Sequence, residues 1–281
     1  MSAMIIDSQV HIWAVETPDR PWLSRTSHLP SPFGYEDLRA EMAKAGVDAA
    51  ILVPPGWEGG INDLALEGAA RYPGQFTVMG RVDLADKSNA RLLPGWTSRP
   101  GMTGIRLAFQ KERESGWLHD GTADWFWAEA EKYDIPLMLF APGENAAFAE
   151  IARGHPNLRI IVDHMNLNRE KDEDAVAVIE SLLPMAEFPN VAVKVSSIPL
   201  YSTEPYPYRN LHPVLERVIR AFGPERAFWG TDLTRIWALI ESYRQCVSVF
   251  TEELDFLSGD DLEWVMGKGI ARFLRWSPGN P

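Results

Sequence analysis

The amino-acid sequence predicts a single (β/α)8 barrel over residues 1–281, with an extra helical segment near its C-terminal end. Eight short apolar runs rich in β-branched residues alternate with stretches of helical periodicity, a pattern typical of repeated βα units. The runs recur at intervals that suit a βα repeat of roughly 30 residues or more. No linker, low-complexity segment or charge block divides the chain, so we expect one barrel domain rather than two smaller ones.

Each apolar run is short enough for a strand and is followed by a segment that can carry a helix. The expected strands are Met4–Ile12, Ala49–Pro54, Phe76–Val82, Gly104–Phe109, Ile135–Phe140, Arg159–Asp163, Val191–Ser196 and Arg226–Gly230. The expected helices are Tyr35–Ala45, Ile61–Tyr72, Thr122–Tyr133, Asn145–Arg153, Asp174–Met185, Asn210–Phe222 and Ile236–Phe250, with Asp260–Trp276 as the extra piece. An open doubly wound sheet is the alternative architecture, but neither a GxGxxG nor a Walker sequence supports it.

The charge balance and the single cysteine limit which macromolecules and ligands the protein is expected to bind. With 27 basic and 39 acidic residues the net charge is −12, which argues against binding to nucleic acid or to an anionic membrane surface. The single cysteine, Cys246, leaves no partner for an intrachain disulfide and no thiolate cluster for a metal. The N-terminus lacks the pattern of a secretion signal, so we expect a cytoplasmic protein, and homo-oligomerisation is left open.

Active sites of such barrels lie at the C-terminal ends of the strands, so polar residues at these ends are the candidates. In the first strand, alternation places Asp7, Gln9 and His11 on one face. The sixth strand ends in Asp163-His164 and the eighth in Thr231-Asp232. A lone histidine is more often a satisfied core residue, but the convergence of His11, His164 and Asp232 predicts a site that activates water or holds a metal.

The fourth strand carries Arg106 inside an apolar run, and Lys111 and Arg113 follow in the loop. A guanidinium in a strand must meet an acid, and a protein carboxylate and a substrate carboxylate are equally good candidates. Lys111 and Arg113 are expected to be solvated charges that steer an anion towards the site.

The seventh strand ends in Ser196, and a Pro- and Tyr-rich loop with Tyr201 follows it. We expect this loop to form a lid or one wall of a pocket, with an aromatic plug of the barrel end as the alternative. Trp13, Trp57 and Phe109 add apolar walls to the same mouth. The other histidines, His28 among them, receive no role, and Cys246 is expected to be a small core residue.

Five segments together carry a family resemblance. They are Asp7–His11, Gly104–Leu107, Ile161–Met165, Val193–Ser196 and Trp229–Asp232, in this order and at the predicted strand ends. With them the chain resembles the amidohydrolase superfamily over nearly its whole length. Within it, the chain is similar to the group that includes 2-pyrone-4,6-dicarboxylate lactonase, L-fuconolactonase and 4-sulfomuconolactonase.

The sequence departs from the family pattern at the metal ligands. The pattern opens with a His-x-His pair, and here Gln9 stands in the first position while His11 keeps the second. A neutral amide is a poor ligand for a transition metal, and the fourth strand offers Arg106 where metal enzymes of the superfamily have a lysine. A two-metal site is therefore not expected, although His11, His164 and Asp232 could hold one zinc or manganese ion.

The resemblance implies a hydrolase that opens a carboxylated lactone without a cofactor. Asp232 would activate water, His164 with His11 or Gln9 would polarise the ester carbonyl, and Arg106 with Lys111 or Arg113 would bind the substrate carboxylate. Tyr201 and Ser196 complete the expected substrate-binding set. A zinc-dependent decarboxylase of an aromatic or muconate-type acid is the second hypothesis. A barrel that binds a small ligand without catalysis is the third.

Overall fold

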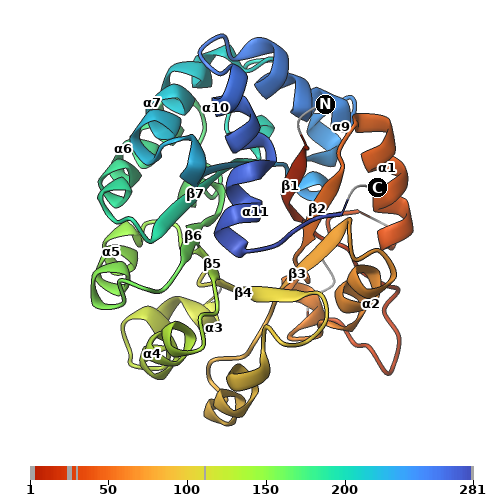
Figure 1. Ribbon diagram of the computed structural model, residues 1–281, viewed down its shortest axis with the longest axis vertical. Coiled ribbons are helices and arrows are strands. Elements are labelled where there is room, and N and C mark those ends of the chain that lie inside the picture. The colour runs from red at the N-terminus through yellow and green to blue at the C-terminus, as the bar shows by residue number, and fades with distance from the viewer. Residues whose placement is uncertain (1–3, 24–26, 30, 111, 280–281) are drawn as a thin grey trace.

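The computed structural model describes residues 4–23, 27–29, 31–110 and 112–279, and it confirms the predicted barrel. Eight parallel strands follow one another around the sheet in chain order (Figure 1). They are β1 (Ile6–Val10), β2 (Ala49–Leu52), β3 (Phe76–Gly80), β4 (Met102–Ala108), β5 (Leu137–Phe140), β6 (Ile160–Val162), β7 (Val191–Ser196) and β8 (Ala227–Gly230). Both ends of every strand lie within two residues of the predicted boundaries.

The barrel closes where β8 meets β1. The backbone N–H of Asp232 donates to the carbonyl oxygen of Gln9 at 3.0 Å, and the N–H of Thr231 donates to Asp7 Oδ1 at 2.9 Å. A Cβ atom on Gly230 would lie 2.2 Å from Ser8 Oγ, so only glycine permits this approach of the two strands. The closure brings the first and last site residues of the chain together.

Strand β1 contains an irregularity that corrects one prediction. Its register against β2 shifts between Asp7 and Val10, so Ile6 packs inside the barrel while Val10 packs in the layer outside it. Strict alternation would have put both side chains on the same face. The prediction that Asp7 shares the face of Gln9 and His11 is therefore wrong, and Asp7 instead bonds Tyr243 of an outer helix.

Helices cover the outside of the barrel (Figure 1). Their bounds are α1 (Tyr35–Ala45), α2 (Asp63–Arg71), α3 (Glu112–Ser115), α4 (Asp124–Lys132), α5 (Asn145–Gly154), α6 (Asp172–Leu182), α7 (His212–Phe222), α8 (Leu233–Ile236), α9 (Tyr243–Ser248), α10 (Gly259–Glu263) and α11 (Gly269–Leu274). Between β3 and β4, where no helix was predicted, the chain forms a 3-10 helix, Lys87–Gly95. The single helix predicted over Ile236–Phe250 is wrong, because Ser242 caps a new helix by accepting from the N–H of Gln245.

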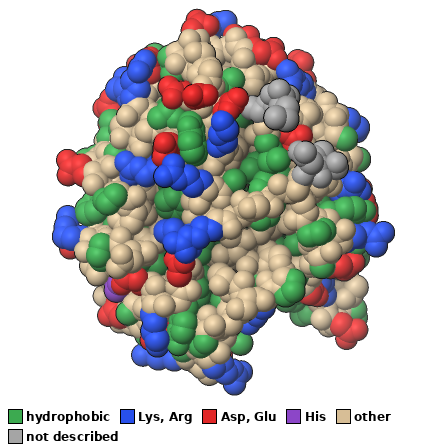
Figure 2. All heavy atoms as spheres, in the orientation of Figure 1, with side chains coloured by type: hydrophobic (Ala, Val, Ile, Leu, Met, Phe, Trp, Pro, Cys, Tyr) green, Lys and Arg blue, Asp and Glu red, His purple; other side chains and the backbone are tan. Residues whose placement is uncertain are grey.

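The interior of the barrel is filled by apolar side chains from the strands and sealed by α11. Ile6, Ile51, Met138 and Phe228 form one cluster with Ile270 of α11, which lies across the near end of the barrel in Figure 1. The same face in Figure 2 carries acidic and basic side chains interspersed. No helix in the described part of the chain is long and apolar enough to cross a membrane. With this end sealed, the opposite end carries the open cavity.

Candidate functional site

A cavity of about 420 Å³ opens at the C-terminal ends of the strands. Five of the predicted site residues line it: His11, His164 and Asp232, together with Gln9 and Arg106. Trp57 and Phe109 form apolar walls, whereas Trp13 is fully buried and packs behind Trp57 with ring centroids 5.3 Å apart. The volume suits a small-molecule substrate.

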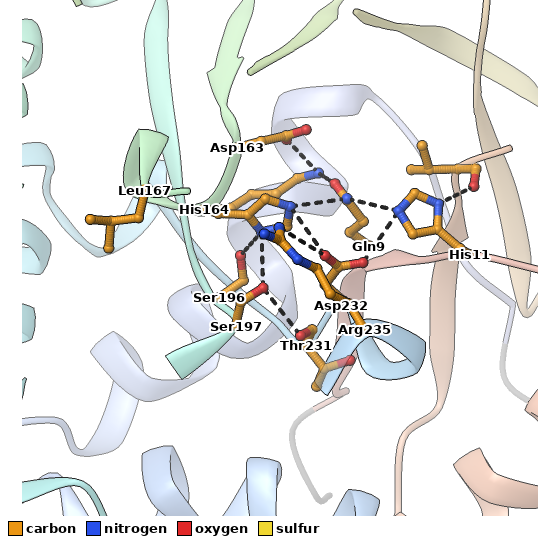
Figure 3. Close-up of polar contacts among 12 residues, drawn as sticks. Gln9, His11, Asp163, His164, Leu167, Ser196, Ser197, Thr231, Asp232 and Arg235 are labelled. Atoms are coloured by element: carbon orange, nitrogen blue, oxygen red, sulfur yellow. Dashed lines mark hydrogen bonds and ion pairs between the residues drawn. The ribbon is translucent and has the colours of Figure 1, made fainter. Parts of the chain in front are cut away.

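Asp232 lies between the two imidazoles (Figure 3). Its Oδ1 is 3.2 Å from His11 Nε2 and its Oδ2 is 3.6 Å from His164 Nε2, so the contact with His11 is the closer one. Burial by itself raises the pKa of the Asp232 carboxyl, but the charge and hydrogen bond of His11 hold it well below 3.8. Asp232 is therefore an ionised carboxylate at neutral pH, facing an open cavity.

The orientation of the Gln9 amide is set by a buried lysine. Lys194 of β7 is fully buried, and its Nζ donates to Gln9 Oε1 at 2.7 Å and lies 2.8 Å from Asp163 Oδ1. An ammonium group has only donors, so Gln9 must present its oxygen to Lys194 and its Nε2 to His164. That nitrogen lies 3.1 Å from His164 Nε2.

The Gln9 amide in turn decides the tautomer of His164. Because Gln9 Nε2 donates, His164 Nε2 accepts, and the ring proton resides on Nδ1. His164 Nδ1 lies 2.7 Å from Ser196 Oγ and 3.2 Å from Ser197 Oγ, which receive that proton (Figure 3). Burial lowers the pKa of His164 to about 3, in agreement with a neutral ring.

His11 has the opposite arrangement. Its Nδ1 lies 2.6 Å from the carbonyl oxygen of Val53, an acceptor, so Nδ1 carries a proton. Nε2 is consequently the atom that faces Asp232. The two imidazoles of the site therefore differ: His164 Nε2 accepts from Gln9, whereas His11 Nε2 can donate to Asp232 only while both ring nitrogens of His11 carry protons.

Several residues that follow β6, β7 and β8 have left-handed backbone conformations without being glycine. Among them are His164 with φ 52°, Ser197 with φ 59° and Asp232 with φ 55°. Such conformations cost roughly 1 kcal/mol or more and concentrate at functional sites. Here they turn His164 and Asp232 towards each other at the barrel mouth.

Arg106 meets a protein carboxylate, which was one of the two alternatives left open. Its Nε donates to Asp163 Oδ2 at 3.0 Å. Burial raises the pKa of Asp163, but the nearby charges of Lys194 and Arg106 outweigh it, so the pKa of this carboxyl is lowered. Arg106 nevertheless still lines the cavity.

Two predicted substrate-binding residues lie elsewhere. Tyr201 is fully buried, donates its hydroxyl to the carbonyl oxygen of Leu167 at 3.1 Å, and does not line the cavity. Ser196 is also fully buried and bonds His164, so it positions the imidazole and cannot reach a substrate. Both assignments are corrected, because each hydroxyl is buried and bonded to the protein, Tyr201 to Leu167 and Ser196 to His164. Lys111 and the side chain of Arg113 lie outside the described residues.

Sequence reasoning missed several residues of the cavity wall, among them Arg81, Arg235 and His28. Arg81 stood inside the apolar run predicted as the third strand, the same signal that singled out Arg106. Arg235 follows Asp232 by three residues, and its Nη1 lies 3.8 Å from Asp232 Oδ2. His28 comes from a long loop, where no periodicity could place it, and its Nδ1 lies 2.9 Å from Thr234 Oγ1.

The donors around Asp232 do not fit a zinc or manganese ion. Gln9 Nε2 lies 3.1 Å from His164 Nε2 and 3.5 Å from His11 Nε2, at the corner where a metal site would need a ligand. An amide N–H has no lone pair for a metal, and turning the amide would direct that N–H at the ammonium of Lys194. The nitrogen of His164 that would ligate is already occupied by this N–H.

A family model described as amidohydrolase matches residues 6–276. The chain belongs to the amidohydrolase family. This amidohydrolase is 26% identical to an L-fucono-1,5-lactonase from Burkholderia ambifaria over 278 residues, which cover 96% of this chain and 95% of the relative. The resemblance inferred from the five sequence segments is thereby confirmed.

Solved structures share the fold at lower identity. An amidohydrolase from Burkholderia multivorans with bound zinc superposes with a TM-score of 0.81 at 21% identity, covering 98% of this chain and 100% of the other. A protein from Pseudomonas putida, provisionally assigned as a 2-pyrone-4,6-dicarboxylic acid hydrolase, superposes with a TM-score of 0.76 at 20% identity, covering 98% of each chain. These likenesses establish the barrel architecture.

Proposed function

We propose that this protein is a hydrolase that opens a carboxylated lactone, in the catabolism of an aromatic compound or a sugar acid. The observation that carries the proposal is Asp232, an ionised carboxylate held between two imidazoles at the wall of an open cavity. The similarity to an L-fucono-1,5-lactonase supports the reaction class. Arginines around the same cavity support an anionic substrate.

Asp232 acts as the general base. It accepts a proton from a water molecule, whose oxygen forms a bond to the lactone carbonyl carbon. The tetrahedral intermediate then collapses, the ring C–O bond breaks, and the leaving oxygen takes the proton from Asp232. The product is an open-chain hydroxy acid, and the carboxylate is ready for another cycle.

Gln9 and His11 stabilise the negative charge that develops on the carbonyl oxygen. Gln9 Nε2 has one proton directed at His164 and a second proton to offer, and the doubly protonated ring of His11 donates through Nε2. His164 does not polarise the carbonyl itself in this proposal, because its Nδ1 proton is directed at Ser196 and Nε2 accepts. His164 instead positions the Gln9 amide.

The reaction proceeds without a metal in this proposal, because the donors around Asp232 do not suit one. The zinc-dependent decarboxylase hypothesis loses support for the same reason. Arg106 binds the substrate carboxylate through the terminal nitrogens that Asp163 leaves unused. Lys111 and Arg113 remain proposed contributors to anion steering.

The test uses a panel of five- and six-membered lactones, with and without a carboxylate. Their hydrolysis is measured as the release of protons into a weakly buffered solution. The protein is treated with chelator, and its metal content is measured by plasma mass spectrometry. We expect turnover of carboxylated lactones with less than about a tenth of an equivalent of metal per chain. Turnover that appears only on addition of zinc contradicts the metal-free mechanism. Release of CO2 from aromatic acids without lactone hydrolysis contradicts the proposed function.

A further inference from the structure

Two guanidinium groups lie side by side on the β3–β4 wall of the cavity. Gly80 at the end of β3 is paired in register with Ile105 of β4, so the next residues, Arg81 and Arg106, occupy neighbouring positions. Adjacent parallel strands are about 4.8 Å apart, and both side chains line the cavity. Neither the family resemblance nor the proposed mechanism gives Arg81 a role.

Both side chains are anchored through the inner part of the guanidinium. Arg81 Nε donates to the carbonyl oxygen of Pro54, and the Arg81 backbone N–H donates to Asn62 Oδ1 at 2.8 Å. Arg106 Nε donates to Asp163 Oδ2. Among the described residues, no acceptor lies within hydrogen-bonding distance of the terminal nitrogens of Arg81 or Arg106. These fixed nitrogens are therefore available to a ligand in the cavity.

The placement of two like charges is unfavourable until an anion joins them. Burial and the neighbouring Arg106 lower the pKa of Arg81 to about 9, and Glu114 and Asp163 compensate only in part. Four arginines, Arg81, Arg106, Arg169 and Arg235, line this cavity with three carboxylates, Asp83, Glu114 and Asp232. In a chain with a net charge of −12, this concentration of cations marks the cavity as a site for an anionic group.

We propose that Arg81 and Arg106 together form a carboxylate-binding subsite, and that Arg81 makes the enzyme select carboxylated lactones over neutral ones. Two forked guanidinium groups match the two oxygens of a planar carboxylate. The inference rests on the proposed function in taking the substrate to be a lactone. The anion-binding subsite itself is inferred from the geometry of Arg81 and Arg106. Arg81 is thus a specificity-determining residue on the β3–β4 wall of the cavity.

The test compares a carboxylated lactone with its methyl ester, two substrates that differ only in charge. We expect the ratio of kcat/KM for acid over ester to fall by about 10- to 100-fold in Arg81→Met, since a charge-assisted hydrogen bond is lost. Arg81→Lys keeps the charge without the fork and should show an intermediate ratio. Arg91→Met, which removes an exposed charge outside the cavity, should keep the ratio of the unaltered enzyme.

An unchanged ratio in folded Arg81→Met protein overturns the proposal. If the unaltered protein opens no lactone, the proposed function fails, and the subsite is then decided by calorimetric titration with succinate and with inorganic phosphate. Succinate binding that is lost in Arg81→Met but kept in Arg91→Met supports the subsite. Succinate binding that is equal in both variants, or absent from the unaltered protein, overturns it. Tighter binding of phosphate than of succinate overturns the assignment to a carboxylate.

Discussion

Asp7 and Asp232 are two buried carboxylates at the same seam of the barrel, and they have opposite properties. Both are buried, with exposed fractions of 0% and 1%, but only Asp232 lines the cavity. Asp7 accepts hydrogen bonds from neutral donors on Thr231, Tyr243 and the backbone, and burial still raises its pKa. Asp232 faces imidazoles and has a lowered pKa. The comparison shows that the partners of a buried carboxylate, and not its burial alone, decide whether its pKa is raised or lowered.

Asp232→Asn is the most direct test of the contrast between Asp7 and Asp232. We expect kcat for lactone hydrolysis to fall by about 100- to 10,000-fold, because the amide cannot accept a proton from water. The variant should still unfold cooperatively in urea, but with a lower free energy of unfolding, because a carboxylate with a lowered pKa stabilises the folded protein at neutral pH and the amide carries no charge. A variant that keeps near-normal hydrolysis removes Asp232 from the mechanism.

Lys194→Met tests how a third buried carboxylate, Asp163, stays ionised. Without the ammonium, Asp163 retains only Arg106 as a cationic hydrogen-bond partner, and Gln9 Oε1 loses its donor. We expect the free energy of unfolding to fall by about 3–5 kcal/mol, the range for breaking a buried ion pair. Lys132→Met, which removes an exposed lysine paired with Glu129, should leave the unfolding free energy unchanged. Equal losses in the two variants would show that Lys194 is not an essential partner.

Asp7→Asn should differ from Asp232→Asn in its effect on kcat. The amide nitrogen would face the hydroxyl donors of Thr231 or Tyr243, which costs about 1–3 kcal/mol of unfolding free energy for unmade hydrogen bonds. The kcat of the folded variant should remain close to that of the unaltered enzyme. If kcat falls as far as in Asp232→Asn, Asp7 takes part in the chemistry and the comparison fails.

The contrast also explains what the sequence could predict. The eight strands were predictable because buried parallel strands are continuous apolar runs, and His11, His164 and Asp232 because they end such runs. The face on which Asp7 lies could not be predicted, because the register shift inside β1 is not visible in the alternation of polar and apolar residues. Lys194 lies in Val193–Ser196, one of the five segments that carry the family resemblance, but its role depends on Gln9, 185 positions away in the chain. Tyr201 and His28 lie in loops, whose paths depend on tertiary packing.

The histidines of the cavity predict the pH dependence of stability. Burial lowers the pKa of His28 to about 4 and that of His164 to about 3, so the folded protein binds fewer protons than the unfolded chain below pH 6.5. Stability is therefore lost as the pH falls from about 6.5 towards these values, by at most about 1.4 kcal/mol per pH unit for each ring. His28→Asn should make the slope shallower in urea unfolding at pH 4.5 to 7. Identical slopes in both proteins would mean that His28 is protonated in the folded state.

The smallest effect is expected for Ser196→Ala, which tests the tautomer of His164. The Nδ1 proton of His164 loses the Ser196 acceptor at 2.7 Å but keeps Ser197 Oγ at 3.2 Å. The ring is therefore still held by one of its two hydrogen bonds on this side. We expect kcat to fall by about 2- to 10-fold with KM unchanged, because one hydrogen bond that positions the ring is weakened. Ser248→Ala removes a buried hydroxyl bonded to Tyr206, outside the cavity wall, and should leave kcat intact. A Ser196→Ala variant that matches Ser248→Ala would show that Ser197 alone holds the ring.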